Sequence, residues 1–178
     1  MEKLLLFLMI LLIVDIEPSN ANNPTRSLNN LKLPGDSTRL VELDRYWAKL
    51  SKTVQEGDFE GYEALYHNDA VVVFTSGKNK ISEPIAKALA SWKKGFNDTK
   101  EGKQNDKVEF RFSQRIGSET TAHETGIFLF TSFDSNNKVK AKSFTHFEVL
   151  LIKRDNEWYA LMEYQKSEAS QEEWDALK

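Results

Sequence analysis

Apolar residues recur at spacings of three or four in three separate parts of the chain, which is the pattern of amphipathic helices. Ser37, Asp58 and Ser82 precede these parts, and all three are residue types that cap helix N-termini. We therefore predict three helices, the first ending at Gly57 and the third holding Pro84 in its first turn. Their inner faces are Leu40, Leu43, Trp47, Leu50 and Val54, then Phe59, Tyr62 and Tyr66, then Ile85, Leu89, Trp92 and Phe96.

From Lys107 onward the pattern changes to an alternation of apolar and polar residues, which is typical of half-buried strands. The turns "GSE", "DSNNK" and "RDNE" are short, so neighbouring strands are expected to pair as antiparallel hairpins. Ser170 with Glu173 forms a capping-box pattern and predicts a final short helix that carries Trp174 and Leu177. The predicted strands are Ala70–Phe74, which follows a corner at 67–69, and then Val108–Ile116, Thr121–Phe133, Val139–Arg154 and Trp158–Lys166.

The order of helices followed by a long meander of strands indicates an α+β fold. Long strands that are apolar on one face must bury that face, and the three amphipathic helices supply the cover. We therefore predict a cone-shaped domain in which a strongly curved antiparallel sheet encloses three helices.

The N-terminal segment has the features of a secretory signal. Leu4–Val14 is apolar but too short to span a bilayer as a helix, and Pro18 and the small residues of "SNA" follow it. We expect cleavage after Ala21 and a secreted or periplasmic protein; an uncleaved anchor is the less favoured alternative. The predicted organisation is a signal peptide at 1–21, a flexible linker at 22–36, the α+β domain at 37–168 and a tail or short helix at 169–178.

Composition narrows the classes of partner. Hydrophobic residues make up 40% of the chain, enough for a packed core, and the absence of cysteine excludes disulfides and thiolate metal sites. The formal net charge is −3; residues 1–21 carry a net of −2, so the chain without them carries −1. This charge gives no reason to expect nucleic acid as a partner, or a membrane after signal cleavage.

Several segments together resemble the nuclear transport factor two-like superfold, which includes SnoaL-like polyketide cyclases and ketosteroid isomerases. They are "GDFEGYEALYHNDAVVVF", "SEPIAKAL", "TAHETG", "THFEVLLIKRDNEWYAL" and "YQKS". The resemblance covers roughly residues 38–167 and is greatest to small SnoaL-like domains of unassigned function. It implies a cystatin-like or SnoaL-like roll with a pocket at the corner between the second helix and the strand after it. The superfold hosts many chemistries, so the resemblance implies no particular activity.

Steroid-isomerase chemistry is disfavoured by the residues at the matching positions. The family's base falls at Phe74, its tyrosine near Leu50 and its protonated aspartate at Thr145. Tyr46 lies one turn before Leu50, but a base and an acidic partner are still missing.

Glu124 is a candidate general base because it shares strand parity with the small residues Ala122 and Gly126, which suit a crowded inner face. The alternatives are that it faces solvent or pairs with a strand neighbour such as Arg111. His67, His123 and His146 show no shared metal-ligand spacing, so we expect no metal and no cofactor.

An aromatic-lined pocket is the expected ligand site. Its predicted lining is Tyr62, Tyr66, Phe74, Trp92, Phe96, Thr145 and Met162, with Glu124 and either Tyr164 or Gln165 as further polar groups. The leading hypothesis is the binding of a small hydrophobic molecule without established catalysis. One alternative is a SnoaL-like isomerase, cyclase or lyase that uses Glu124 as base, and another is a dimerising interaction module with a vestigial pocket.

The outward face of the long strand 139–154 is a candidate homodimer surface. It carries Phe144, His146, Glu148, Leu150 and Ile152, of which three are apolar. The alternative is a monomer in which the C-terminal helix with Trp174 covers this face.

Overall fold

The computed structural model describes residues 34–77 and 80–177, all within one compact unit. The predicted signal peptide at 1–21 and residues 22–33 of the predicted linker lie outside the described residues. The last three residues of that linker, 34–36, are helical, so the first helix begins before the predicted cap Ser37. The elements are α1 (Pro34–Glu56), α2 (Phe59–Glu63), β1 (Tyr66–Phe74), β2 (Ile81–Pro84), α3 (Ile85–Lys100), β3 (Gln104–Gly117), β4 (Thr121–Asp134), β5 (Val139–Arg154), β6 (Glu157–Glu168) and α4 (Gln171–Ala176).

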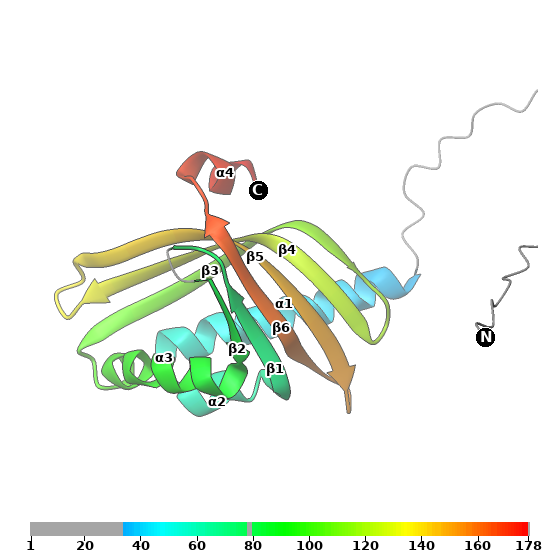
Figure 1. The fold of residues 1–178 in the computed structure, drawn as a ribbon, viewed down its shortest axis with the longest axis horizontal. Coiled ribbons are helices and arrows are strands. Elements are labelled where there is room, and N and C mark those ends of the chain that lie inside the picture. The colour runs from blue at the N-terminus through cyan, green and yellow to red at the C-terminus, as the bar shows by residue number, and fades with distance from the viewer. Residues whose placement is uncertain (1–33, 78–79, 178) are drawn as a thin grey trace, which may run out of the picture. The chain divides into compact units, whose positions relative to one another are not determined.

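The strands form a six-stranded sheet in the order β2-β1-β6-β5-β4-β3 (Figure 1). The predicted hairpins between β3, β4, β5 and β6 are confirmed as antiparallel pairs. The prediction of a wholly antiparallel sheet is wrong, because β1 runs parallel to β6 and makes the sheet mixed. A parallel pair needs a long connection, and the chain between these two strands, with α3 and three long strands, provides it.

The strong curvature predicted for the sheet is also not found. The sheet is open, with β2 and β3 at its two edges (Figure 1). The register of each long pair shifts at only one or two isolated places. Such bulges bend individual strands, whereas closing a sheet requires a regular tilt and stagger of every strand.

Helix α1 confirms the first predicted stripe, because Leu43, Trp47 and Leu50 are all buried in the core. Gly57 ends this helix with φ of +66°, in the left-handed region that favours glycine. A Cβ atom on Gly57 would lie 2.5 Å from the backbone nitrogen of Lys100 and from the carbonyl oxygen of Phe96. Glycine therefore both turns the chain and admits the close approach of α3. None of the described helices is long and apolar enough to cross a membrane.

The corner after α2 differs from the prediction. Strand β1 begins at Tyr66, four residues earlier than expected, so Tyr66 belongs to the strand and not to the helix. Strand β2 was not predicted at all: Ser82, expected to cap a helix, pairs with Val73 instead, and α3 begins at Ile85. A four-residue edge strand carries too few residues to show an alternating pattern, and its burial pattern shows no alternation.

The C-terminal helix α4 begins with the predicted capping box, since Ser170 and Glu173 bond each other's backbone nitrogens. Figure 1 shows α4 on the opposite side of the sheet from α1, α2 and α3. Trp174 is buried there against Ile127, Leu129 and the partly buried Phe144. The helix therefore covers part of the face that was a candidate dimer surface.

Candidate functional site

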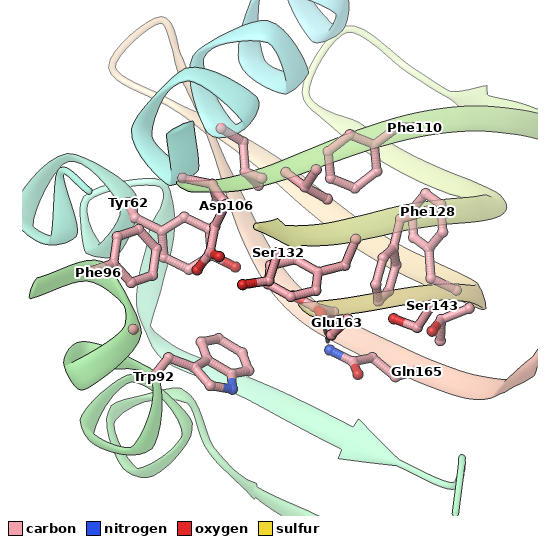
Figure 2. Close-up of a pocket in the computed structure, with 18 of the residues that line it drawn as sticks. Tyr62, Trp92, Phe96, Asp106, Phe110, Phe128, Ser132, Ser143, Glu163 and Gln165 are labelled. Atoms are coloured by element: carbon pink, nitrogen blue, oxygen red, sulfur yellow. Dashed lines mark hydrogen bonds between the residues drawn. The ribbon is translucent and has the colours of Figure 1, made fainter. Parts of the chain in front are cut away.

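A cavity of about 870 Å³ lies between the sheet and the helices α1, α2 and α3 (Figure 2). From the sheet it is lined by Phe110, Phe128, Phe130 and Phe147. The cavity walls are thus mainly aromatic, with polar side chains at separate places.

Most of the predicted pocket residues line this cavity. Tyr62, Tyr66, Trp92, Phe96 and Thr145 do so, and Figure 2 shows Tyr62, Trp92 and Phe96 directed into it.

Two predicted residues, Phe74 and Met162, are not among the lining residues. The Phe74 ring packs against Trp92, with the ring centroids 6.3 Å apart. Met162 is displaced by a bulge in β6: Leu150 pairs with Met162 but the next residue of β5, Leu151, pairs with Ala160. The extra residue changes which side chains of β6 face inward.

As a result, Glu163 and Gln165 face the cavity. Gln165 was one of two alternatives in the sequence, whereas Glu163 was missed. A regular alternation along β6 would place Glu163 on the opposite face from Ala160, whereas the bulge places both residues on the same face. No glycine or proline near Leu161 marks the bulge in the sequence.

Glu163 lies within a short chain of hydrogen bonds. The Tyr66 hydroxyl donates to its Oε2 at 2.5 Å, and Gln165 Nε2 donates to its Oε1 at 2.8 Å. The hydroxyls of Tyr62 and Tyr66 are 3.0 Å apart. Glu163 is half-buried, because part of its side chain faces the cavity.

Burial raises the pKa of Glu163, and the hydrogen bonds from Tyr66 and Gln165 oppose this rise only in part. Burial and the nearby Glu163 carboxylate also raise the pKa of Tyr66 well above its ordinary value, so this tyrosine stays a donor. The arrangement therefore offers a carboxyl that can hold or release a proton inside an apolar cavity.

Glu124, the predicted general base, faces inward as its parity indicated and is fully buried. It does not line the cavity. Its Oε2 accepts a hydrogen bond from Trp47 Nε1 at 2.5 Å, and its Oε1 accepts one from Arg115 Nε at 2.6 Å. Arg115, and not the expected Arg111, is its partner because the two residues are opposite each other in the β3–β4 register.

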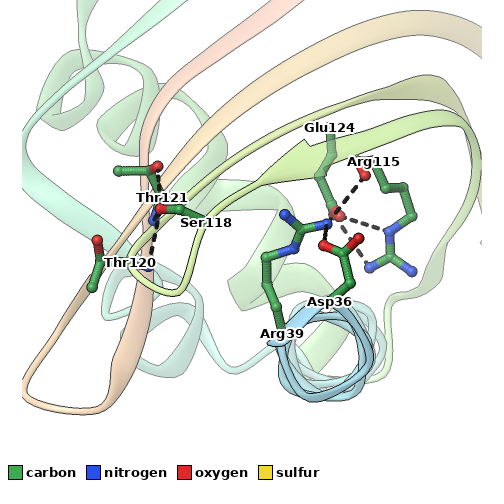
Figure 3. A network of polar contacts seen from close by, with 7 residues as sticks. All are labelled: Asp36, Arg39, Arg115, Ser118, Thr120, Thr121 and Glu124. Carbon is green, nitrogen blue, oxygen red and sulfur yellow. Dashed lines mark hydrogen bonds and ion pairs between the residues drawn. The ribbon is translucent and has the colours of Figure 1, made fainter. Parts of the chain in front are cut away.

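The surroundings of Glu124 tie α1 to the sheet (Figure 3). Arg115 Nη1 also reaches Asp44 Oδ1 at 2.5 Å, and Arg39 Nη2 donates to the carbonyl oxygen of Arg115 at 3.3 Å. Arg39 is itself paired with Asp36 at 3.0 Å. This geometry favours a structural role for Glu124, and its catalytic role stays a prediction.

The three histidines are dispersed. His123 lies 3.4 Å from Glu148 and His146 lies 3.3 Å from Glu173, both on the face away from the cavity, and His67 is on β1. Across the part of the chain that the structure describes, no three histidine or acidic residues are grouped so as to hold a metal ion.

Comparison with known proteins places the fold. An NTF-2-like protein of unknown function from Shewanella oneidensis superposes with a TM-score of 0.56 at 15% identity, over 72% of this chain and 98% of that one. The fold is nuclear transport factor two-like. At this low identity the similarity establishes the fold alone, and it confirms the resemblance seen in the sequence at that level.

Two further solved structures match the chain at similarly low identity. The β subunit of benzoate 1,2-dioxygenase from Burkholderia mallei matches with a TM-score of 0.60 at 11% identity, over 73% of this chain and 90% of that one. A ketosteroid isomerase-like protein from Erwinia carotovora matches with a TM-score of 0.50 at 13% identity, over 74% of this chain and 97% of that one. No protein-family model and no curated protein sequence matches the chain.

Proposed function

We propose that this nuclear transport factor two-like domain binds a small hydrophobic molecule in its aromatic cavity, with Glu163 as a polar anchor. The observation that carries the proposal is the cavity itself. Its volume of about 870 Å³ falls in the usual range for ligand pockets, roughly 300–1,000 Å³, and its walls combine aromatic rings with a few polar groups, as such pockets do.

Glu163 fixes the orientation of the ligand in this proposal. Tyr66 and Gln165 each bond one of its oxygens, and each carboxylate oxygen has a second lone pair for a further donor. Because its pKa is raised, the group can also be protonated and donate to a carbonyl or hydroxyl oxygen of the ligand.

Acid–base catalysis is a second candidate function, and the raised pKa of Glu163 favours it. An isomerase, cyclase or lyase needs a carboxyl that exchanges a proton with the substrate inside a water-poor pocket. Glu163 meets this requirement better than Glu124, since both oxygens of Glu124 bond Trp47 and Arg115 away from the cavity lining.

Export of the protein remains part of the proposal and is supported by the pattern of residues 1–21 alone. Self-association through the outer sheet face is less well supported, because Trp174 packs on Phe144 there, with ring centroids 5.8 Å apart.

The test is a thermal-shift and NMR titration against a panel of neutral hydrophobic metabolites, with the wild type and Glu163→Gln. Glu157→Gln is the matched control, because Glu157 lies on the same strand but is exposed. We expect at least one compound to shift cavity resonances, and Glu163→Gln but not Glu157→Gln to alter its affinity. Product formation that stops in Glu163→Gln would move the proposal to the catalytic candidate.

A further inference from the structure

The cavity has a second polar region, where α3 ends and β3 begins, and it is separate from Glu163. Thr99, Gln104 and Asp106 line it. In the sheet, Asp106 is beside Ser132, and Ser132 is beside Ala141 of β5. Glu163 is beside Val149, eight residues further along the same strand. A ligand therefore meets two polar regions at different places.

Two buried polar atoms in this region have no hydrogen-bond partner within the described part of the chain. The residues Thr99 and Asp106 are only 9% and 7% exposed. Gln104 Nε2 donates to Asp106 Oδ2 at 2.8 Å, but neither Asp106 Oδ1 nor Thr99 Oγ1 has a hydrogen-bond partner among the described residues. Leaving a buried acceptor without a donor is costly, so such atoms in a cavity wall are candidates for a ligand.

Beside Asp106 the cavity wall is formed by a residue of α3 that has no side chain. Gly95 lies inside α3, where glycine is less favourable than alanine. A Cβ atom at Gly95 would stand 3.8 Å from Gln104 Nε2 and 3.9 Å from Asp106 Oδ2. A side chain would therefore fit at Gly95 without a clash, but it would narrow the cavity next to the two polar groups.

Acidic side chains outnumber basic ones in the lining of the cavity as a whole, which favours a cationic ligand. Asp106, Glu163 and Glu168 line the cavity, and Lys140 lines it with the opposite charge. Lys140 Nζ donates to Gln104 Oε1 at 3.1 Å. The ion pairs formed between described residues include none to these three carboxylates.

Aromatic faces lie on the same helix surface as Thr99. Trp92 and Phe96 precede it by seven and three residues, spacings that place all three on one face of α3. Both rings line the cavity, and Figure 2 shows Phe96 and Asp106 among the side chains directed into it. The face of an aromatic ring attracts a positive charge within about 6 Å of its centre.

We propose that the ligand carries an ammonium group on an apolar body and that Asp106 and Thr99 hold that group. An alkylammonium has only donors, which match the acceptor Oδ1 of Asp106 and the hydroxyl of Thr99. The apolar body lies along the aromatic walls. This inference rests on the proposed function, because it requires that the cavity binds a small molecule.

The test uses three probes of similar shape: naphthylethylamine, ethylnaphthalene and naphthylpropanoate, titrated by calorimetry into the wild-type protein. We expect the amine to bind at least about tenfold more tightly than the neutral probe and the carboxylate to bind most weakly. Asp106→Asn should weaken the amine by about tenfold or more and leave ethylnaphthalene unchanged.

Two further variants make the result specific. Thr99→Val should weaken the amine several-fold, because it removes one acceptor and keeps the shape of the side chain. Glu101→Gln is the control for charge alone: Glu101 follows α3, is exposed and does not line the cavity. It should leave all three affinities unchanged. If Asp106→Asn does not fold, Thr99→Val is the deciding variant: it should weaken the binding of the amine and leave the binding of ethylnaphthalene unchanged.

The outcomes separate the two proposals. If ethylnaphthalene binds and the amine binds no better, or if the preference for the amine survives in both Asp106→Asn and Thr99→Val, the ammonium site is wrong and the cavity proposal stands. A loss of the same size in Glu101→Gln would assign the preference to net charge and would also overturn the site. If none of the probes binds to the wild type, both proposals fail.

Discussion

The Tyr66 hydroxyl donates a hydrogen bond of 2.5 Å to the Glu163 carboxylate inside the cavity. This contact joins β1 to β6, the one parallel strand pair of the described sheet. It also joins the two residues whose placement depended most on local irregularities, since Tyr66 begins a strand earlier than expected and Glu163 follows a bulge. The most distinctive chemistry of the cavity thus lies where the fold departs from a regular pattern.

The raised pKa of Glu163 predicts a pH dependence of stability. In the unfolded chain this group titrates near its ordinary value of 4.5, and burial raises the pKa in the folded state. Its contribution to stability is therefore fully present below about pH 4.5 and is lost as pH rises through the folded pKa. We expect the free energy of unfolding of the wild type, relative to that of Glu163→Gln, to fall over this window and then level off.

Urea denaturation of both proteins across a pH series measures this difference. A difference that stays constant with pH would mean that the Glu163 pKa is not raised on folding, and one that grows with pH would mean that its sign is opposite.

Glu124 should contribute to stability and not to binding. Glu124→Gln weakens the bond to Arg115 while Trp47 keeps an acceptor, so we expect a loss of about 1–3 kcal/mol in the free energy of unfolding. Glu109→Gln, on the neighbouring strand at an exposed position, should change stability by less than about 0.5 kcal/mol. Chemical denaturation measures both. Unchanged stability of Glu124→Gln together with loss of a catalysed reaction would restore Glu124 as the catalytic candidate.

Much of the fold could be predicted because the spacing of apolar residues repeats several times along each long helix and strand. The stripe through Leu43, Trp47 and Leu50 extends over several turns, and the short turns between β3 and β6 leave only antiparallel pairing. The capping box at Ser170 is a local signal with a local cause, and it too is confirmed. The inward parity of Glu124 followed from its small neighbours on β4.

The parts that could not be predicted depend on contacts between distant segments. The pairing of Val73 with Ser82 and the parallel pairing of β1 with β6 have no marker within either strand. The bulge near Leu161 reverses which side chains of β6 face the cavity, so Met162 was chosen where Glu163 lies. The sequence did not mark Asp106 as a cavity residue either, because a single carboxylate at the start of a strand has the same pattern as a polar loop residue.

A substitution at Gly95 should affect the stability of the protein and the affinity of the cavity in opposite directions. Gly95→Ala should raise the free energy of unfolding by about 0.5–1 kcal/mol, because it removes a glycine from inside α3 and meets only ordinary contacts. The same change should weaken the binding of naphthylethylamine, since the methyl group narrows the space beside Asp106. Parallel thermal denaturation and calorimetry test both effects. A stabilised variant with unchanged amine affinity would place the ammonium group elsewhere in the cavity.

Helix α4 should control self-association. Deleting residues 170–178 exposes Ile127, Leu129 and Phe144, which Trp174 contacts in the full chain. We expect the shortened chain to associate at concentrations where the full chain stays monomeric, as measured by sedimentation velocity. Glu172→Ala, an exposed change on the same helix, should behave like the wild type. A full-length protein that is already a dimer would instead support the dimer predicted from the outer face.

The most direct test of the central claim is a titration of the wild type and Ser132→Phe with a neutral, polarity-sensitive naphthalene dye. Ser132 lines the cavity and is 7% exposed, so a phenylalanine there fills the space that a ligand would occupy. Ser113→Phe adds the same ring at an exposed position outside the cavity and is the control. We predict saturable, blue-shifted emission with the wild type and with Ser113→Phe, and its loss with folded Ser132→Phe. Equal dye binding by all three proteins, or none by the wild type, would contradict the claim that the cavity is the binding site.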